Sequence, residues 1–143
     1  MTTATTTLAQ AIDHYGVDVY DHLDRELSIP IIAGKPQRQG DVLCLPRNTT
    51  KAATTLVPKA GYPVVRGENG GNTHLLLEGW AGPIYFDPHP ATAGNLKLGT
   101  LTVPPGSVAY LAHPEHGYMG YGPGTYRVNR QREQADELRM VQD

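Results

Sequence analysis

This chain is organised around residues 113–133, which read His113-Pro114-Glu115-His116-Gly117 and, after four further residues, Gly122-Pro123-Gly124-Thr125-Tyr126-Arg127-Val128-Asn129-Arg130-Gln131-Arg132-Glu133. Pro114 has a φ angle that suits the first central position of a β-turn, so we expect the Cα atoms of His113 and His116 to lie within about 7 Å of each other. The Gly-Pro-Gly segment predicts a second turn. The alternation that follows predicts a strand that buries Tyr126 and Val128. Arg127 and Asn129 are expected to face outward.

The composition bounds the fold class. The chain has 143 residues, enough for one domain with a core of its own. Sixteen Gly and twelve Pro indicate many turns and short strands rather than a helical bundle. A formal net charge of -2 gives no electrostatic argument for nucleic acid or an acidic membrane surface. The single cysteine, Cys44, excludes an internal disulfide, and its apolar neighbours predict a buried thiol.

The N-terminal region carries the strongest helical pattern. Apolar residues recur at spacings of three and four between residues 8 and 27, which predicts an amphipathic helix with one apolar stripe. The stripe consists of Leu8, Ala11, Ile12, Tyr15, Val19, Leu23 and Leu27. Gly16 weakens the middle of this helix, so a break at Gly16 is the alternative to one continuous helix. We expect residues 1–30 to form a helical extension whose stripe packs against the β domain or against another chain.

About seven short strands are expected after the extension, separated by turn signals every eight to twelve residues. They are predicted at residues 41–45, 62–66, 73–77, 84–86, 96–103, 107–112 and 125–130. Residues 28–39 are expected to be a connector, and Glu68-Asn69-Gly70-Gly71-Asn72 is expected to be a hairpin turn. The sequence therefore predicts a mainly β domain over residues 38–143, built as a small antiparallel β-barrel or sandwich.

Histidines and carboxylates from two segments form the candidate site. His74 and Glu78 share one face of a predicted strand, and the other candidates belong to the turn at residues 113–116. If that face and the turn share a cavity, three imidazoles and a carboxylate would suit Zn²⁺, Fe²⁺ or Mn²⁺. The ligands would be His74, His113 and His116, with Glu78 or Glu115 as fourth ligand or base. Imidazoles also suit acid–base catalysis at neutral pH. The alternative is a solvated surface turn.

The spacing faintly resembles the first metal motif of cupins, in which two histidines one residue apart precede a glutamate. Here Asn72 stands at the first histidine position, followed by His74 and Glu78. The second cupin motif places a histidine shortly after Pro-x-Gly, whereas residues 104–106, Pro-Pro-Gly, are followed by Ala109. The resemblance implies a metal-dependent β-barrel enzyme that uses the three histidines named above.

A second resemblance covers the chain from Gln39 to its end. The pattern is Gly-Asp-Val-Leu, then Gly-Glu with a following Gly-His-x-His, then His-x-Glu-His, then Gly-x-Tyr-x-Val-x-x-Gln-Arg-Glu. Outside the first of these segments, the chain matches at Gly67, Glu68, Gly71, His74, His113, Glu115, His116, Gly124, Tyr126, Val128, Gln131, Arg132 and Glu133. It departs at Asn72, where the pattern has histidine. In these motifs the chain resembles an uncharacterised bacterial family, which implies a coherent β domain without an assigned activity.

Other functional classes are not favoured by the sequence. Arginines and tyrosines near the C-terminal end would suit RNA, but acidic residues offset that charge, so nucleic acid is not an expected partner. There is no Gly-x-Ser-x-Gly elbow, P-loop or dinucleotide fingerprint. No apolar run reaches the roughly 18 residues of a membrane span, and the Thr-rich start lacks the character of a secretory signal, so we expect a cytoplasmic protein.

Three functions stay open. The preferred one is a small soluble binding or accessory module that acts through partner contacts, with or without a histidine-based divalent metal site. The second is the metal-dependent enzyme that the cupin likeness implies, with zinc or another divalent metal as cofactor. The third is an assembly subunit that docks a partner, or a second copy, through its N-terminal helix. An enzyme is the less favoured reading, because the histidine set is incomplete and no nucleophile is offered.

Overall fold

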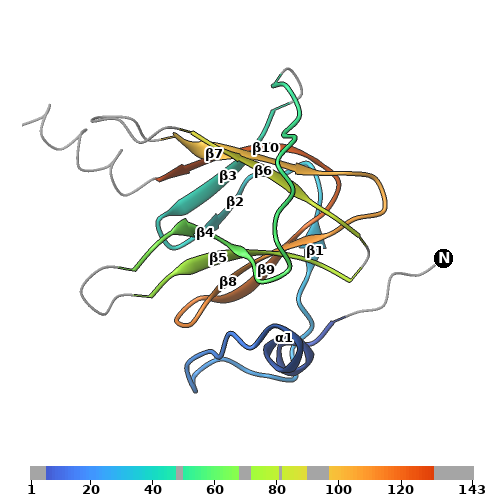
Figure 1. Ribbon diagram of the computed structural model, residues 1–143. Coiled ribbons are helices and arrows are strands. Elements are labelled where there is room, and N and C mark those ends of the chain that lie inside the picture. Colours follow the sequence, from blue (N-terminus) through green and yellow to red (C-terminus); the bar gives the residue numbers. More distant parts are fainter. Residues whose placement is uncertain (1–5, 48–49, 68–71, 81, 90–96, 131–143) are drawn as a thin grey trace, which may run out of the picture.

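A computed structural model describes residues 6–47, 50–67, 72–80, 82–89 and 97–130. These residues form one short helix and ten strands, arranged as two five-stranded sheets. The sheets face each other as two layers, and the helix lies outside one of them (Figure 1). The prediction of a mainly β fold is confirmed. Of the two predicted arrangements, the sandwich fits, and the sheets do not close into a barrel.

The first sheet has the order β1-β9-β8-β5-β4 and the second has the order β2-β3-β10-β7-β6. The first consists of β1 (Ile31–Ile32), β9 (Gly117–Tyr121), β8 (Ala109–His113), β5 (His74–Glu78) and β4 (Tyr62–Val65). The second consists of β2 (Gln37–Gln39), β3 (Val42–Pro46), β10 (Gly124–Arg130), β7 (Lys97–Val103) and β6 (Tyr85–Pro88). All pairs are antiparallel except β1 with β9.

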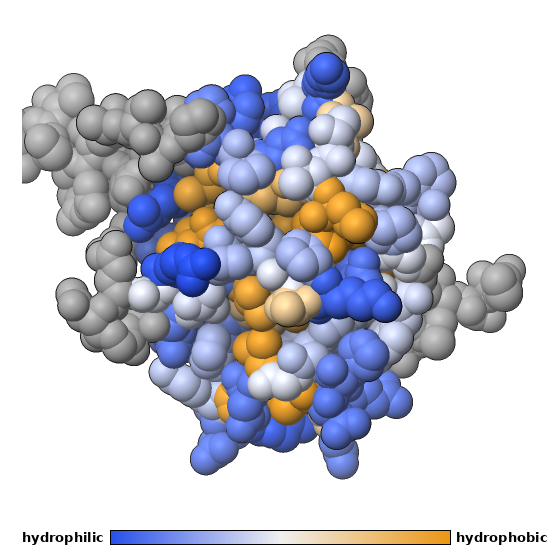
Figure 2. All heavy atoms as spheres, viewed as in Figure 1, coloured by the Kyte–Doolittle hydropathy of each residue, from blue (hydrophilic) through white to orange (hydrophobic). Residues whose placement is uncertain are grey.

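The main core lies between the two sheets. Tyr126 and Val128 of β10 are fully buried in it, whereas Arg127 and Asn129 are only partly buried, so the predicted register of the last strand is confirmed. Cys44 of β3 is buried in the same core, as predicted. In the view of Figure 2, apolar residues gather between the sheets, and further apolar residues show near the helix among hydrophilic ones.

A second core lies on the outer face of the first sheet, under the N-terminal segment (residues 6–29). The cluster contains Leu77, Tyr110, Ala112 and Tyr118 of that sheet and Val108, which directly precedes β8. The side chains that cover them include Leu8, Ala11, Val19 and Ile29. Two hydrogen bonds join the N-terminal segment, which we call the cover, to the first sheet: the Tyr15 hydroxyl donates to the Glu78 carbonyl, and the Tyr118 hydroxyl donates to the Val17 carbonyl. The predicted apolar stripe therefore packs against the chain's own β domain, except for Leu27, which is exposed.

The predicted helix over residues 8–27 is wrong in its extent. The helix α1 spans Leu8–Tyr15 and ends at Gly16, which has a φ of 80° and donates its N–H to the Ile12 carbonyl. A left-handed glycine of this kind is a common helix stop. At the other end, Thr7 and Gln10 form a capping box. Residues 17–27 continue over the same sheet in turns, with Val19 buried.

Three strands were not expected from the sequence: β1 and β2, which lie in the predicted connector, and β9, which follows the histidine turn. The turn itself forms as predicted, because β8 and β9 pair as a hairpin with His113 opposite Gly117. The other seven strands lie where they were predicted, within three residues at each end. Most of the predicted turn at 68–72 and the tail from 131 lie outside the described residues. Within the described chain, no helix is long and apolar enough to cross a membrane.

Candidate functional site

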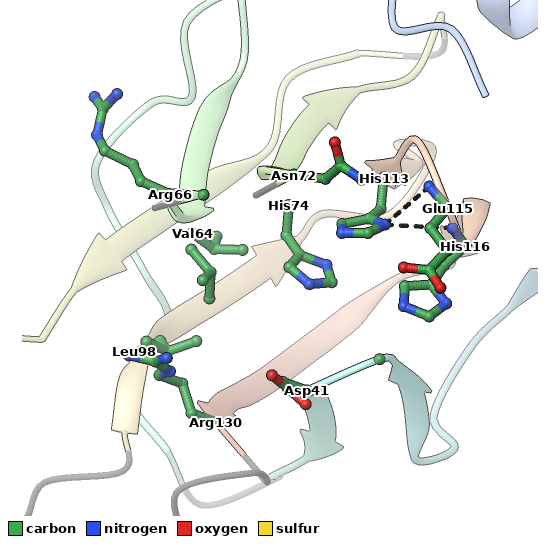
Figure 3. Close-up of a pocket in the computed structure, with 13 residues that line it drawn as sticks. Asp41, Val64, Arg66, Asn72, His74, Leu98, His113, Glu115, His116 and Arg130 are labelled. Atoms are coloured by element: carbon green, nitrogen blue, oxygen red, sulfur yellow. Dashed lines mark hydrogen bonds between the residues drawn. The ribbon is translucent and has the colours of Figure 1, made fainter. Parts of the chain in front are cut away.

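A cavity of about 710 Å³ opens between the two sheets at the end where β5 begins and β8 ends. This volume falls within the range of small-molecule sites in proteins. Its walls come from both sheets and from the β8–β9 turn (Figure 3). The residues that line it are Gly40, Asp41, Val64, Val65, Arg66, Gly67, Asn72, His74, Leu98, His113, Glu115, His116 and Arg130.

Three imidazoles are brought together in this cavity. The ring centroids of His74 and His113 lie 4.2 Å apart, those of His113 and His116 lie 4.6 Å apart, and those of His74 and His116 lie 6.2 Å apart. Strand alternation explains two of them. His74 shares the inward face of β5 with Leu76, and His113 shares the inward face of β8 with Leu111. His116 comes from the turn and is exposed.

The ring of His113 holds the β8–β9 turn in place. Its Nδ1 atom accepts hydrogen bonds from the backbone N–H groups of Glu115, at 3.1 Å, and His116, at 3.3 Å. Asn and Asp side chains stabilise turns by bonds of the same kind. Because Nδ1 accepts two bonds, it carries a lone pair, and the proton of the neutral ring lies on Nε2.

A buried amide holds the ring of His74 in place. The Gln39 Nε2 atom donates to the carbonyl of Leu111, at 2.8 Å, and to that of Gly117, at 3.1 Å. Both of its protons are thereby used, so its Oε1 atom must be the acceptor in the 2.9 Å contact with His74 Nδ1. His74 consequently carries its proton on Nδ1, and its Nε2 atom keeps a lone pair.

Both buried imidazoles are held in the neutral form. Burial, followed by the neighbouring rings of His113 and His116, lowers the pKa of His74 from 6.5 to about 4. The pKa of His113 is also lowered, mainly by burial and then by His116, although Glu115 and Asp41 act in the opposite direction. Removing a charged ring from water without a carboxylate partner is costly, which is why the neutral form prevails.

The carboxylates predicted for the site fall in different places. Glu115 lines the cavity, but Glu78 does not. Glu78 lies at the opposite end of β5, four residues from His74, which corresponds to about 13 Å along a strand. Asp41, which the sequence did not single out, lines the cavity instead. Asn72, the position of the missing histidine, also lines the cavity, and its amide donates to the Tyr20 hydroxyl at 2.8 Å.

Sequence reasoning also missed the β2–β3 turn. Gln39 looked like the end of a connector, yet its side chain is fully buried and fixes His74. Gly40 follows with a φ of 55°, and a Cβ atom there would lie 2.7 Å from His116 Nε2. A Cβ atom there would force the exposed His116 ring to shift, and the positive φ itself favours glycine. The Gly40-Asp41 pair is the one local signal of this turn, and nothing in it indicates a histidine partner.

The three histidines do not fit the predicted three-nitrogen metal site as they stand. In the described part of the chain, no group of three His, Cys, Asp or Glu side chains is placed to hold a metal ion. His74 presents a lone pair at Nε2, as a metal ligand must. The Nδ1 lone pair of His113, in contrast, is taken by two backbone N–H groups, and its Nε2 atom carries a proton.

The fold and the cavity define a small β-sandwich domain with a histidine-lined site. The chain belongs to a family described as a domain of unknown function (DUF8820), whose model matches residues 38–131. The expectation of an uncharacterised family is thus confirmed, while the quoted motifs and the cupin likeness stay predictions. Comparisons with curated proteins and with solved structures found no match. The family match covers the cavity residues but not the N-terminal segment.

Proposed function

We propose that this domain is a binding module whose cavity takes a small polar molecule. The observation that carries the proposal is the convergence of His74, His113 and His116 on one cavity between the sheets. Hydrogen bonds at Nδ1 fix the ring of His74 to Gln39 and the ring of His113 to the β8–β9 turn. In each ring, Nε2 takes no part in these bonds. Polar atoms fixed in this way, beside the apolar walls of Val64 and Leu98, are typical of ligand sites.

A divalent metal ion is the second candidate for this cavity. The observation that favours it is the bond between His74 Nδ1 and Gln39 Oε1. Metal-binding histidines usually donate their second ring nitrogen to an oxygen in this manner. His116 and Asp41 are the side chains that would complete such a site, after a rearrangement of the exposed His116 ring. A metal-dependent activity would depend on this rearrangement.

Acid–base catalysis is less well supported than binding. A catalytic histidine is normally oriented by a carboxylate that stabilises its protonated form. The partner of His74 is the neutral amide of Gln39, and the pKa of about 4 leaves this ring a weak base at neutral pH. We therefore propose a binding function in preference to an enzymatic one.

Contacts with a partner protein remain part of the proposal. The apolar stripe of the N-terminal segment, apart from Leu27, packs on the chain's own sheet, so that part is not available for docking as it stands. Tyr20 and Leu27 of the same segment are exposed, at 48% and 63%, and would form the contact with another chain. Light scattering of the Leu27→Ser variant beside the unaltered chain tests this contact.

The cavity proposal is tested by filling the cavity. Leu98 lines it and is partly buried, so Leu98→Trp would occupy ligand space. The matched control is Leu56→Trp, at a position that is 58% exposed and does not line the cavity. Both proteins and the unaltered chain are incubated with a cell metabolite extract, washed and denatured, and the released molecules are identified by mass spectrometry. A compound retained by the unaltered chain and by Leu56→Trp, but not by Leu98→Trp, supports the proposal. Equal retention by all three contradicts it.

A further inference from the structure

We propose that the cavity selects a neutral, hydroxyl-bearing ligand, such as a polyol or a sugar, because His113 and His74 stand side by side as a fixed hydrogen-bond donor and a fixed acceptor. The inference rests on the proposed function and names its ligand class. It replaces the three-nitrogen metal site that the sequence predicts with a site that recognises hydrogen-bonding groups.

The donor is Nε2–H of His113. The two backbone N–H groups of the turn that point at Nδ1 fix the proton on the opposite nitrogen. In Figure 3 this second nitrogen lies on the side of the ring that points away from the turn. The turn therefore does more than position the ring: it also determines that the ring offers a donor to the cavity.

The acceptor is Nε2 of His74. Its tautomer depends on Gln39, whose amide could in principle be rotated by half a turn. The rotated amide would place its oxygen against the carbonyl oxygens of Leu111 and Gly117, so the two backbone carbonyls exclude it. Gln39 is 1% exposed, and water cannot offset such a mismatch. The His74 ring therefore offers an acceptor, and its centroid lies 4.2 Å from that of the His113 ring, which offers the donor.

A hydroxyl group matches this pair with a single atom. Its oxygen accepts from His113 Nε2–H while its proton is donated to His74 Nε2. A carboxylate offers acceptors alone and would leave His74 Nε2 without a donor. An ammonium group offers donors alone and would leave His113 Nε2–H without an acceptor. Leaving either group unpaired beneath a bound ligand costs its desolvation, which is the source of the selectivity.

The charges around the pair also favour a neutral ligand. Among the described residues that line the cavity, the carboxylates of Asp41 and Glu115 equal in number the guanidiniums of Arg66 and Arg130. The carboxylates and guanidiniums of the described lining therefore give no excess of either charge to attract an ion. The same carboxylates, with the amide of Asn72, are groups that hydrogen-bond to further hydroxyls of a polyol or sugar.

The test uses two variants that each remove one member of the pair. His113→Asn keeps a side-chain acceptor for the turn N–H groups, as in an Asx-turn, and removes the Nε2–H donor. His74→Phe keeps an aromatic ring in the space and removes the acceptor. Arg38→Ala, at an exposed position on β2, is the control. The full chain is titrated with glycerol, myo-inositol, D-glucose and D-galactose, and separately with acetate and Zn²⁺, while the histidine ring protons are followed by NMR. His22 and His89, both exposed, are internal references.

We expect at least one of the four neutral probes to give saturable shifts at His74 and His113, with binding about tenfold weaker in each variant and unchanged in Arg38→Ala. That ratio corresponds to about 1.4 kcal/mol. Saturable shifts with acetate or Zn²⁺ and none with the four neutral probes would overturn the inference but leave a binding module. No saturable shift with any probe would count against both the inference and the proposed function.

Discussion

The first sheet has two faces that the chain covers in different ways. On the outer face, the N-terminal segment closes over Tyr110 and Tyr118. The hydroxyls of Tyr15 and Tyr118 donate to the backbone carbonyls of Glu78 and Val17. On the inner face, the end that carries His74 and His113 faces a cavity with polar walls. Strand β8 serves both faces, because all five of its residues are buried and they alternate between the two. The outer face is thus closed by packing, whereas the inner end is left open at the cavity where we propose that a ligand binds.

Removing the cover is expected to have the largest effect. Deletion of residues 1–30 would uncover the outer apolar face and lose the buried side chains of Leu8, Val19 and Ile29. At about 1.5–3 kcal/mol for each such side chain, the loss is on the order of 5 kcal/mol or more. We expect association in light scattering and a much lower urea midpoint. Deletion of residues 1–5 is the control. A truncated chain that stays monomeric and equally stable would show that the cover is dispensable.

A substitution in the inter-sheet core gives a loss of stability with which the loss of the cover can be compared. Tyr126 is fully buried, and its hydroxyl donates to the Gly122 carbonyl and accepts from the Gly34 N–H. Tyr126→Ala should lower the free energy of unfolding by about 3–5 kcal/mol, because a large aromatic side chain is removed from a packed site. Urea denaturation measures this loss. A variant as stable as the unaltered chain would mean that β10 has another register.

The cavity should make stability depend on pH. The unfolded chain protonates His74 near pH 6.5, whereas the folded chain resists protonation down to about pH 4. Between these values the unfolded state binds more protons, so stability is complete above pH 6.5 and falls as the pH is lowered toward 4. Urea midpoints measured across this range should fall, and His74→Phe should flatten the slope. An unchanged slope in that variant would mean that His74 is already accessible to protons.

A single hydroxyl of the outer cover should give the smallest effect. Tyr118 donates to the Val17 carbonyl at 2.8 Å, in a contact that is partly buried. Tyr118→Phe keeps the ring and removes this bond, so it should cost about 0.5–1.5 kcal/mol in urea denaturation. The variant should leave ligand titrations of the cavity unchanged. A change in the histidine signals on ligand titration would mean that the two faces are coupled through β9.

Local patterns were sufficient for the larger part of the fold. Alternation and turn residues predicted seven of the strands, the burial of Tyr126 and the histidine turn. The helix was overextended because the stripe continues past Gly16 in residues that cover the same sheet without being helical. The periodicity reflects the face being covered, and it does not reveal that a left-handed glycine ends the helix.

The missed strands depend on contacts that the sequence does not display. Gln37 and Gln39 look solvated, yet their amides are buried and donate to the carbonyls of Gly120 and of Leu111 and Gly117. In β9, Gly120 is needed because a Cβ there would lie 2.8 Å from the Pro30 carbonyl oxygen. Glycine weakens the sequence signal of a strand. The close packing of β9 against Pro30 requires a glycine, and for that reason the strand was missed.

The candidate site was predicted only in part, because some of the contacts that form it are also not displayed by the sequence. Strand alternation and the turn brought His74, His113, His116 and Glu115 to one cavity, while Glu78 was misplaced by the length of β5. The hydrogen bonds that set the tautomers come from a buried amide and from the backbone of a turn. Neither can be read from residue types or spacing, and both decide what the imidazoles can bind.

The protonation of the two buried rings is the most direct test of this account. Side-chain nitrogen shifts in a ¹⁵N-histidine sample of the full chain at pH 7.5 distinguish the two neutral tautomers from each other and from the imidazolium. We predict the proton on Nδ1 of His74, bonded to Gln39, and on Nε2 of His113, opposite the turn. The reverse tautomer at either ring, or a charged ring, would contradict it.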